Sequence, residues 1–501
     1  MSLLDSFQGW VGQDLAVVDR RYYWIGLGLL TWIIWIVASS LRQNAKYKYP
    51  NPIPGIPFFG NSFQMPLKGQ GPYTTKLASK SGDILVANSK TSRFTMKFGG
   101  THWLFLNSRR AVTALLDKKA AIYSSRQNLP MANDVISGSK RLLLMPYGPD
   151  WRKQRKAMHQ ILNNTKSSIF RPFQDAESRA LLYHYMGKPD RWWEANARFA
   201  NSIVMSVTYG KRSSLGDPDL ANLLRNADQF VPYLMPGQAL VDMFPWLLKL
   251  PIPSSWQPWR WWGDALHQST RSGEFTMEEC YFMAGALIEA GSDTTRVTLM
   301  EIIAAAVLYP DWVERAQQQL DLVCGSKAER LPDFGDMPEL PLIKAIIKEG
   351  LRWKPAIAET GIPHSLIKDD TFEGYKIAAG TVVTYNHWAI SQLDYEDSER
   401  FYPERFLDDD LDVPTKGHLG FGAGRRVCVG NTVAWNNMFI AVSRLLYCFN
   451  ISGVPGETID TTVRFDTDYG KAPFQVNIKP RSEAHRQLIE RECADAAKME
   501  S

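Results

Sequence analysis

A cysteine inside a glycine-rich segment is the feature that most restricts what this 501-residue chain can fold into. Phe421–Gly430 reads Phe-Gly-Ala-Gly-Arg-Arg-Val-Cys-Val-Gly, and an apolar helical pattern follows it as far as Tyr447. The glycines allow a tight backbone loop that comes close to a flat ligand. Cys428 stands where this loop meets the start of the helix, whose dipole and free N–H groups favour a thiolate.

Arg426 lies two residues before Cys428 and can meet an anionic group of such a ligand. A thiolate held by N–H donors beside a cation predicts a haem-iron site with Cys428 as the axial ligand. The alternative is a buried structural cysteine beside a Gly-rich turn, which is the usual reading of a lone cysteine. The pattern Phe-x-x-Gly-x-Arg-x-Cys-x-Gly, which includes Phe421 and Gly424, is complete here and favours the haem site.

The composition is that of a folded protein and argues against several other classes. Aromatic residues make up 12% of the chain and include 17 Trp, which indicates a large apolar core rather than disorder. The net charge of +5 is too small for a chain of this length to indicate a nucleic-acid partner. The five cysteines are widely spaced without a CxxC pair, which argues against disulfides and a zinc site. We therefore expect an intracellular protein.

Tyr22–Leu41 is an uncharged run between Arg20–Arg21 and Arg42. As a helix it would be about 30 Å long, the thickness of the hydrocarbon core of a bilayer. It predicts a transmembrane anchor after a short leader, residues 1–21. The alternative is a signal peptide cleaved near Ala38, but the apolar run is long and the leader is acidic as well as basic.

Residues 42–60 are basic and then proline-rich, which predicts a stiff connector between the anchor and a globular domain over 61–480. The distribution of basic residues weakly favours a cytoplasmic body. Glycosylation sequons at Asn163 and Asn450 would be usable only if the body were lumenal. Residues 481–501 are charged and predict a solvated tail.

The body combines short apolar strands, such as Trp103–Leu106, with mainly helical patterns, which predicts a mainly α fold with small β-sheets. Phe372–Tyr385 predicts a hairpin that turns at Gly380. The Trp-rich segment Phe244–Asp264 is either core packing or a surface that dips into the membrane. The clearest helical patterns are Met277–Leu308, Asp311–Leu322 and Pro341–Arg352.

Two pairs of residues share a helical face. Glu349 and Arg352 can form an ion pair at i,i+3, which outside any special context is usually a solvated pair worth little. Trp151 and Arg155 are one turn apart, so both can face one anion. The alternative for the second pair is a Trp–Arg stack on the helix surface.

The helix pattern over Met277–Leu308 contains Ala290-Gly291-Ser292-Asp293-Thr294-Thr295. Gly291 weakens a helix by up to about 1 kcal/mol, and Asp293 and Thr294 place two proton-exchanging groups beside it. A polar kink in an apolar helix suggests a place where oxygen or water must fit. The alternative is a capped break between two helices.

Together these motifs resemble the cytochromes P-450, in style the fungal microsomal members, from the anchor to about residue 480. The resemblance implies the cytochrome P-450 fold and haem b bound through Cys428. It also implies haem propionate contacts from Trp151, Arg155 and His364. For His364 the alternative is a loop histidine whose hydrogen bonds are satisfied within the protein. The Glu349-Gly350-Leu351-Arg352 helix and Arg405, in Phe401–Phe406, would form a buried structural network. Asp293 and Thr294 would deliver protons during dioxygen activation.

The resemblance further implies a monooxygenase that uses O2 and electrons from NADPH, delivered by a cytochrome P-450 reductase that cytochrome b5 can assist. The substrate would be a hydrophobic small molecule, because Ala356–Thr360 is largely apolar, and secondary-metabolite biosynthesis is the expected role. We expect a single-pass protein of the endoplasmic reticulum membrane with a cytoplasmic catalytic domain. Two alternatives are a haem-thiolate isomerase or dehydratase that needs no reductase, and a non-catalytic haem-binding protein. The intact Asp293-Thr294 pair argues against both.

The chain departs from the family pattern in two places. Between the Trp-rich segment and Gly291 the chain is short where the family has two or more further helices. Ile84–Arg93 resembles an insertion before a strand. Both departures affect the expected substrate pocket and leave the haem ligand unchanged.

Overall fold

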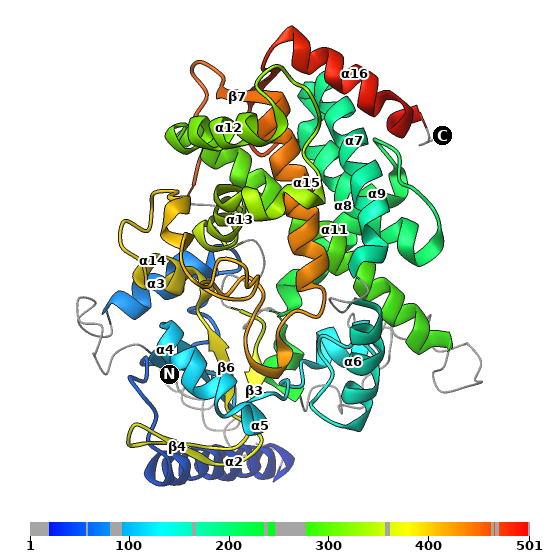
Figure 1. Ribbon diagram of the computed structural model, residues 1–501. Coiled ribbons are helices and arrows are strands. Elements are labelled where there is room, and N and C mark those ends of the chain that lie inside the picture. The colour runs from blue at the N-terminus through cyan, green and yellow to red at the C-terminus, as the bar shows by residue number, and fades with distance from the viewer. Residues whose placement is uncertain are drawn as a thin grey trace, which may run out of the picture.

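The computed structural model describes residues 20–56, 59–80, 93–162, 167–234, 239–245, 277–355, 361–461, 465 and 470–498. Within these residues the chain is mainly helical, with two small β-sheets in the lower part of Figure 1 and a third at the top. This confirms the predicted mainly α fold with small β-sheets. Most of the leader, the insertion, the Trp-rich segment and all of Ala356–Thr360 lie outside the described residues, as does Asn163.

Four long helices pack side by side and form the centre of the molecule (Figure 1). They are α7 (Arg171–Gly187), α8 (Trp192–Tyr209), α11 (Met277–Leu308) and α15 (Asn431–Cys448). From Val297 to Ala306 every residue of α11 is buried, because the helix carries apolar side chains nearly all round. This packing places α11 and α15 on opposite walls of the cavity described below.

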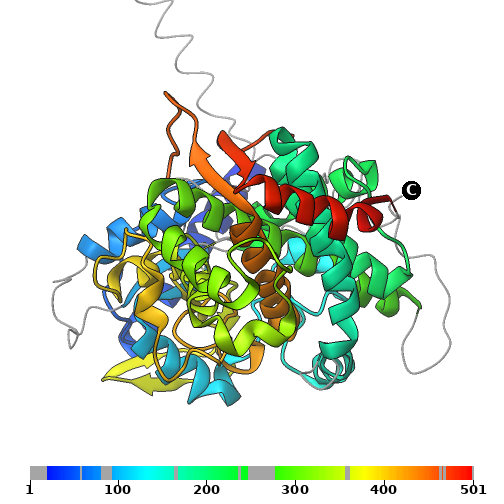
Figure 2. The same ribbon diagram turned by 45° about the horizontal axis from the view of Figure 1, so that its top comes forward.

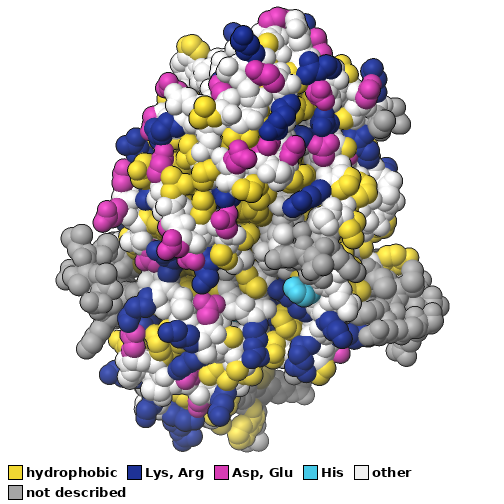
Figure 3. All heavy atoms as spheres, viewed as in Figure 1, with side chains coloured by type: hydrophobic (Ala, Val, Ile, Leu, Met, Phe, Trp, Pro, Cys, Tyr) yellow, Lys and Arg dark blue, Asp and Glu magenta, His cyan; other side chains and the backbone are white. Residues whose placement is uncertain are grey.

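The other helices surround this centre, and two of them confirm predicted patterns: α12 (Asp311–Cys324) and α13 (Pro341–Trp353). The remainder are α3 (Gln70–Lys80), α4 (Arg109–Val112), α5 (Ala120–Tyr123), α6 (Pro149–Leu162), α9 (Pro218–Phe230), α10 (Leu240–Met243) and α14 (His387–Leu393). Charged side chains of both signs cover the face seen in Figure 3, and basic ones gather on its lower part.

A four-stranded sheet lies beside the helical centre in the order β1-β2-β6-β3. It consists of β1 (Arg93–Phe98), β2 (Thr101–Leu106), β6 (Val382–Tyr385) and β3 (His364–Ser365). β2 and β6 are parallel although almost 280 positions separate Trp103 from its partner Val382. The sheet therefore joins the two halves of the chain and fixes His364 in a buried strand.

The predicted hairpin that turns at Gly380 is wrong. β4 (Asp370–Phe372) pairs with β5 (Tyr375–Ile377), so the turn is Glu373–Gly374. Both turn residues have positive φ, 48° and 79°, as type I′ turns require. The strand expected as the second arm, β6, belongs to the other sheet.

The N-terminal helix α2 (Arg20–Lys46) covers the predicted anchor and lies along β4 (Figure 1). Lys46 forms an ion pair with Asp369 at 3.8 Å, and the Tyr47 hydroxyl donates to the same carboxylate at 3.0 Å. In the part of the chain that the structure describes, we find no helix that is long and apolar enough to cross a membrane. The predicted transmembrane anchor is therefore not confirmed.

The C-terminal residues differ from the predicted solvated tail. Glu483–Lys498 forms α16, which lies across α7 in Figure 2. Leu488, Ile489 and Cys493 are completely buried, because they form an apolar stripe that the charged composition of this segment hides. A last two-stranded sheet, β7 (Phe449–Gly453) with β8 (Val476–Pro480), leads into this helix.

Candidate functional site

The segment before Cys428 folds into the tight loop that its glycines predict. Gly424 has a φ of +63° and donates its backbone N–H to the Asp117 carboxylate at 2.6 Å. A Cβ atom at this position would lie 2.1 Å from the carbonyl oxygen of Leu116. Gly424 is therefore required by both backbone conformation and space. The Cys428 N–H donates to the Phe421 carbonyl at 2.8 Å and closes the loop.

Cys428 lies just before the first turn of α15, and the backbone N–H of Gly430 points at its sulfur. Burial raises the pKa of the Cys428 thiol, while the Gly430 N–H and the charge of Arg155 act in the opposite direction. Cys324, Cys448 and Cys493 are sealed in the core, whereas the Cys428 side chain lines a cavity. Coordination to a metal removes the proton of such a thiol outright.

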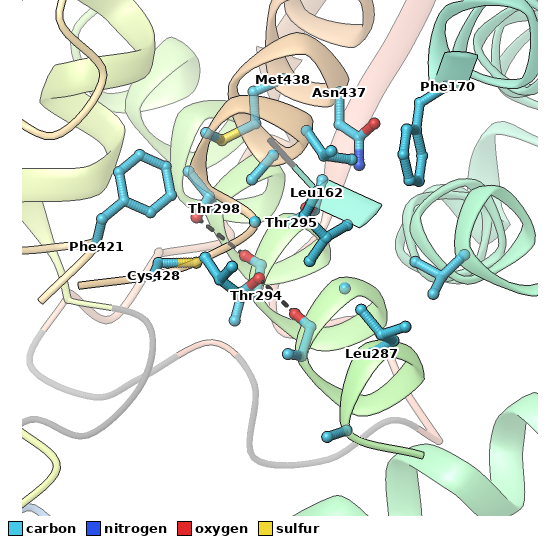
Figure 4. Close-up of a pocket in the computed structure, with 18 of the residues that line it drawn as sticks. Leu162, Phe170, Leu287, Thr294, Thr295, Thr298, Phe421, Cys428, Asn437 and Met438 are labelled. Atoms are coloured by element: carbon cyan, nitrogen blue, oxygen red, sulfur yellow. Dashed lines mark hydrogen bonds between the residues drawn. The ribbon is translucent and has the colours of Figure 1, made fainter. Parts of the chain in front are cut away.

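The cavity has a volume of about 220 Å³ and is mostly apolar. α11 forms one wall, and the Cys428 loop with the start of α15 forms the facing wall. Figure 4 shows Thr294 and Cys428 directed toward the same space, with Phe421 beside the sulfur. The cavity therefore lies between the Cys428 thiol and α11, and we call this space the slot.

Three buried or half-buried arginines lie near this slot and donate only to backbone carbonyls among the described residues. Arg126 donates to Ile362 and Pro363, each at 2.7 Å. Arg426 donates to Ser124 at 2.8 Å and Met145 at 2.7 Å, and Arg155 donates to Val427. We call Arg126, Arg155 and Arg426 the arginine cluster.

The arginine cluster carries positive charge that no described carboxylate balances. Burial, then repulsion from Arg126 and Arg155, lowers the pKa of Arg426 to about 8. Burial also lowers the pKa of Arg126 to about 10. Holding cations together in a dry interior is unfavourable unless an anion joins them. The two propionate groups of haem supply such charges, so the residues present fit haem.

The predicted propionate contacts Trp151 and His364 lie beside this cluster. The Trp151 ring is buried, with the Arg426 guanidinium 4.2 Å and the Arg155 guanidinium 5.9 Å from its centroid. The His364 Nδ1 atom lies 2.9 Å from the Tyr123 carbonyl oxygen. Burial and the nearby Arg126 lower the pKa of His364 well below its usual value, so the ring is neutral without an anion beside it.

Arg126 belongs to the site although no sequence motif indicated it. Its carbonyl partners Ile362 and Pro363 are 236 and 237 positions away, and no local motif marks it. In the sequence Arg126 is simply a basic residue after Ser125 in a non-helical stretch. Many arginines on protein surfaces have the same local sequence environment, so this gives no sign of a buried site. The fold alone makes it part of the cluster.

The structure separates the predicted pair on α11. Thr294 lines the cavity, and its hydroxyl donates to the Ala290 carbonyl at 2.8 Å. Asp293 does not line the cavity; it is buried in an ion pair with Arg296, whose Nε lies 3.1 Å from its carboxylate. The expected alternative of a capped break does not occur, because α11 is continuous through this region.

Gly291 has a packing role in this structure. A Cβ atom there would lie 2.4 Å from the Val204 side chain on α8. The Asn201 amide of α8 also donates to the Ser292 hydroxyl at 2.8 Å. The glycine therefore lets α8 and α11 approach closely, which holds the cavity wall in place.

Glu349, Arg352 and Arg405 come together as one buried network. The Glu349 carboxylate accepts from Arg352 at 2.6 and 2.8 Å and from Arg405 at 3.2 Å. It also accepts from the Tyr402 backbone N–H at 2.8 Å. Glu349 is 0% exposed and Arg352 1%, so this is no solvated surface pair. The network joins α13 to the segment around Arg405.

A cysteine at a helix start, an apolar slot and a buried arginine cluster define a haem-thiolate protein. Comparison with known sequences gives the same class. A sequence profile described as "Cytochrome P450" matches residues 50–269 and 263–473. The chain belongs to the cytochrome P450 family, and it is a monooxygenase as the relatives are named.

Two curated relatives illustrate the likeness. The chain is 32% identical to "Cytochrome P450 monooxygenase verL" of Clonostachys rogersoniana, over 93% of each chain. It is 30% identical to "Cytochrome P450 monooxygenase 58" of Postia placenta, over 96% of this chain and 97% of the relative. A solved zebra fish cytochrome P450, determined with abiraterone, shares the fold with a TM-score of 0.63 at 24% identity. The likeness covers 82% of this chain and 100% of that one.

Proposed function

We propose that this protein is a membrane-anchored monooxygenase that oxidises a hydrophobic small molecule in secondary-metabolite biosynthesis. The observation that carries the proposal is that Cys428 and Thr294 face one apolar cavity from opposite walls. The family implies haem, dioxygen and electrons from a redox partner. We assign the electrons to NADPH, passed on by a cytochrome P450 reductase that cytochrome b5 can assist; these partners would approach through the basic lower part of the face in Figure 3.

Each wall of the cavity has a distinct task in this proposal. Haem, when bound, supplies the centre at which dioxygen is reduced and one oxygen atom is inserted into the substrate. Cys428 would hold the iron, and the arginine cluster with Trp151 and His364 would bind the propionates. Thr294 holds a proton at its Oγ1 atom on the α11 wall. The apolar lining, including Leu287 and Val204, excludes water and favours an apolar substrate.

Replacing Thr294 with alanine tests this assignment. The substitution removes a hydroxyl from the cavity wall without touching Cys428, so the variant should still bind haem. Loss of a general acid typically lowers the rate of the proton-transfer step by about 10²–10⁴-fold, although a water molecule that replaces the hydroxyl can reduce the effect. We expect NADPH consumption to continue while hydrogen peroxide per NADPH rises. The measurement uses the full-length holoenzyme with reductase, and wild type is the reference.

The same assay separates the monooxygenase from the alternatives. Thr208 also lines the cavity but lies on α8, so Thr208→Val is the matched control and should leave the peroxide yield unchanged. An unchanged yield in Thr294→Ala would contradict its role in proton transfer. Turnover of a lipid hydroperoxide without NADPH would favour an isomerase, and no NADPH oxidation at all would favour a non-catalytic haem protein.

The membrane anchor rests on the uncharged run Tyr22–Leu41 and on the large apolar side chains that α2 leaves exposed. Trp24 and Trp35 are 67% and 66% exposed, which is unusual for a helix in water. We expect a truncation of residues 1–41 to shift the protein from the membrane to the soluble fraction. Glycan on Asn163 or Asn450 would show that the body is lumenal rather than on the cytoplasmic side of the endoplasmic reticulum.

A further inference from the structure

Glu301 is a buried acidic residue inside the cavity that no motif of the sequence singled out. It is 2% exposed and lies on α11. Among the described residues that line the cavity it is the one carboxylic acid. A carboxyl group in such a place can hold and release a proton.

Glu301 lies on the same face of α11 as two threonine hydroxyl groups that line the cavity. Thr294, Thr298 and Glu301 are spaced by four and three residues, so they share one face of the helix. All three line the cavity. The Thr298 hydroxyl donates to the Thr294 carbonyl at 3.0 Å, and Figure 4 shows the two side chains in sequence along the wall.

These groups are close enough to exchange protons through few intermediaries. Glu301 is about 10 Å from Thr294 along the helix axis, at about 1.5 Å per residue, and Thr298 lies between them. Each threonine hydroxyl gives its hydrogen to the helix backbone and keeps lone pairs that can accept from a water molecule or a side chain. One or two water molecules would complete a line of hydrogen-bonding groups from Glu301 through Thr298 to Thr294.

Asp293, the acid expected from the motif, has a different environment. Its carboxylate is held by Arg296 on the same helix and lies outside the cavity lining. Taking a proton onto Asp293 would leave the guanidinium of Arg296, itself buried, without its counter-charge. The ion pair therefore disfavours Asp293 as the acid that serves Thr294.

We propose that Glu301, through Thr298, is the acid that supplies protons to Thr294. This inference rests on the proposed monooxygenase function. In each transfer one proton leaves the Glu301 carboxyl group and reaches the Thr294 hydroxyl by exchange along the line. One proton from solvent water restores Glu301, and no electrons move. Glu301 therefore acts on the reaction only through Thr294 and does not touch the substrate.

The first test is spectroscopic and needs no substrate. Full-length holoenzyme is reduced, loaded with carbon monoxide and photolysed, and the infrared difference spectrum is recorded in light and heavy water. Departure of the probe from the cavity changes the hydrogen bonds of groups that line it. We expect a carboxylic-acid C=O band that shifts in heavy water, is lost in Glu301→Gln and remains in Asp293→Asn. Absence of the band in wild type, or its persistence in Glu301→Gln, would overturn the proposal.

The second test measures hydrogen peroxide released per NADPH oxidised, with reductase and without added substrate. We expect Glu301→Gln to slow the proton-dependent step by about 10²-fold, the lower end of the range for general acid help. Its peroxide yield should therefore rise as in Thr294→Ala, whereas Asp293→Asn should stay close to wild type. The reverse order of the two variants would assign the role to Asp293.

Two controls separate failure of this inference from failure of the proposed function. Each variant is first checked for the thiolate-type Soret band of the reduced carbon monoxide complex. If wild type lacks this band, the proposed function itself fails. If Glu301→Gln alone does not retain haem, Glu301→Asp replaces it. The shorter acid should move the infrared band and return the peroxide yield most of the way to the wild-type value, and an unmoved band would overturn the proposal.

Discussion

Replacing Cys428 with alanine is expected to abolish the red-shifted Soret band that thiolate-ligated haem shows after reduction and addition of carbon monoxide. Cys428 is the described cysteine whose sulfur lines the cavity and receives a backbone N–H from Gly430. Alanine leaves the loop conformation intact, since the Cys428 N–H bond to Phe421 involves only the backbone. The variant should retain the fold, lose the thiolate spectrum and lose NADPH-dependent turnover.

Cys324→Ala is the matched control. Its side chain is also buried, but it lies at the end of α12 and contacts Asp336 at 3.9 Å rather than the cavity. This variant should keep the thiolate spectrum at slightly lower stability. A normal thiolate spectrum from Cys428→Ala would refute the ligand assignment directly.

Replacing Glu349 with alanine should produce the largest loss of stability. The substitution leaves Arg352, which is 1% exposed, without the carboxylate that balances its charge. Removing one partner of a buried ion pair costs about 3–5 kcal/mol. We expect a free energy of unfolding lower by this amount, seen as a lower urea midpoint for loss of helical circular dichroism.

An exposed pair provides the comparison. Lys211 and Asp219 are 3.7 Å apart with side chains 60% and 80% exposed. Lys211→Ala should change stability by less than about 1 kcal/mol, since water screens such pairs. Equal effects of Glu349→Ala and Lys211→Ala would mean that the buried network contributes no more than a surface pair.

Features encoded by neighbouring residues could be predicted from the sequence. The Cys428 loop and the helices α11, α12 and α13 depend on glycine positions and on the 3.6-residue period, which are local. The turn at Gly374 rather than Gly380 could not be predicted, because both positions offer a glycine with positive φ. The choice between the two turns is made when β6 pairs with β2, a strand from the first half of the chain, because β6 is then not free to pair with β4.

The candidate site shows the same limit. Cys428 and Thr294 line the cavity as their motifs indicate, but the motif around Thr294 does not tell where the Asp293 side chain points. That depends on Arg296 one turn further along α11. Arg126 and Glu301 join the site through the fold, so their neighbouring residues carry no sign of these roles. The charged composition of α16 likewise hides the apolar stripe that packs against α7.

The bond between Gly424 and Asp117 has a consequence for how the protein matures in the cell. Asp117 ends the short π-helix Thr113–Asp117, which is synthesised about 300 residues before the cysteine loop. Chains fold from the N-terminus as they emerge, so this half must wait in a partly open state for its partner. The Gly424–Asp117 bond, which supports the loop that carries Cys428, can therefore form only after most of the chain has been synthesised.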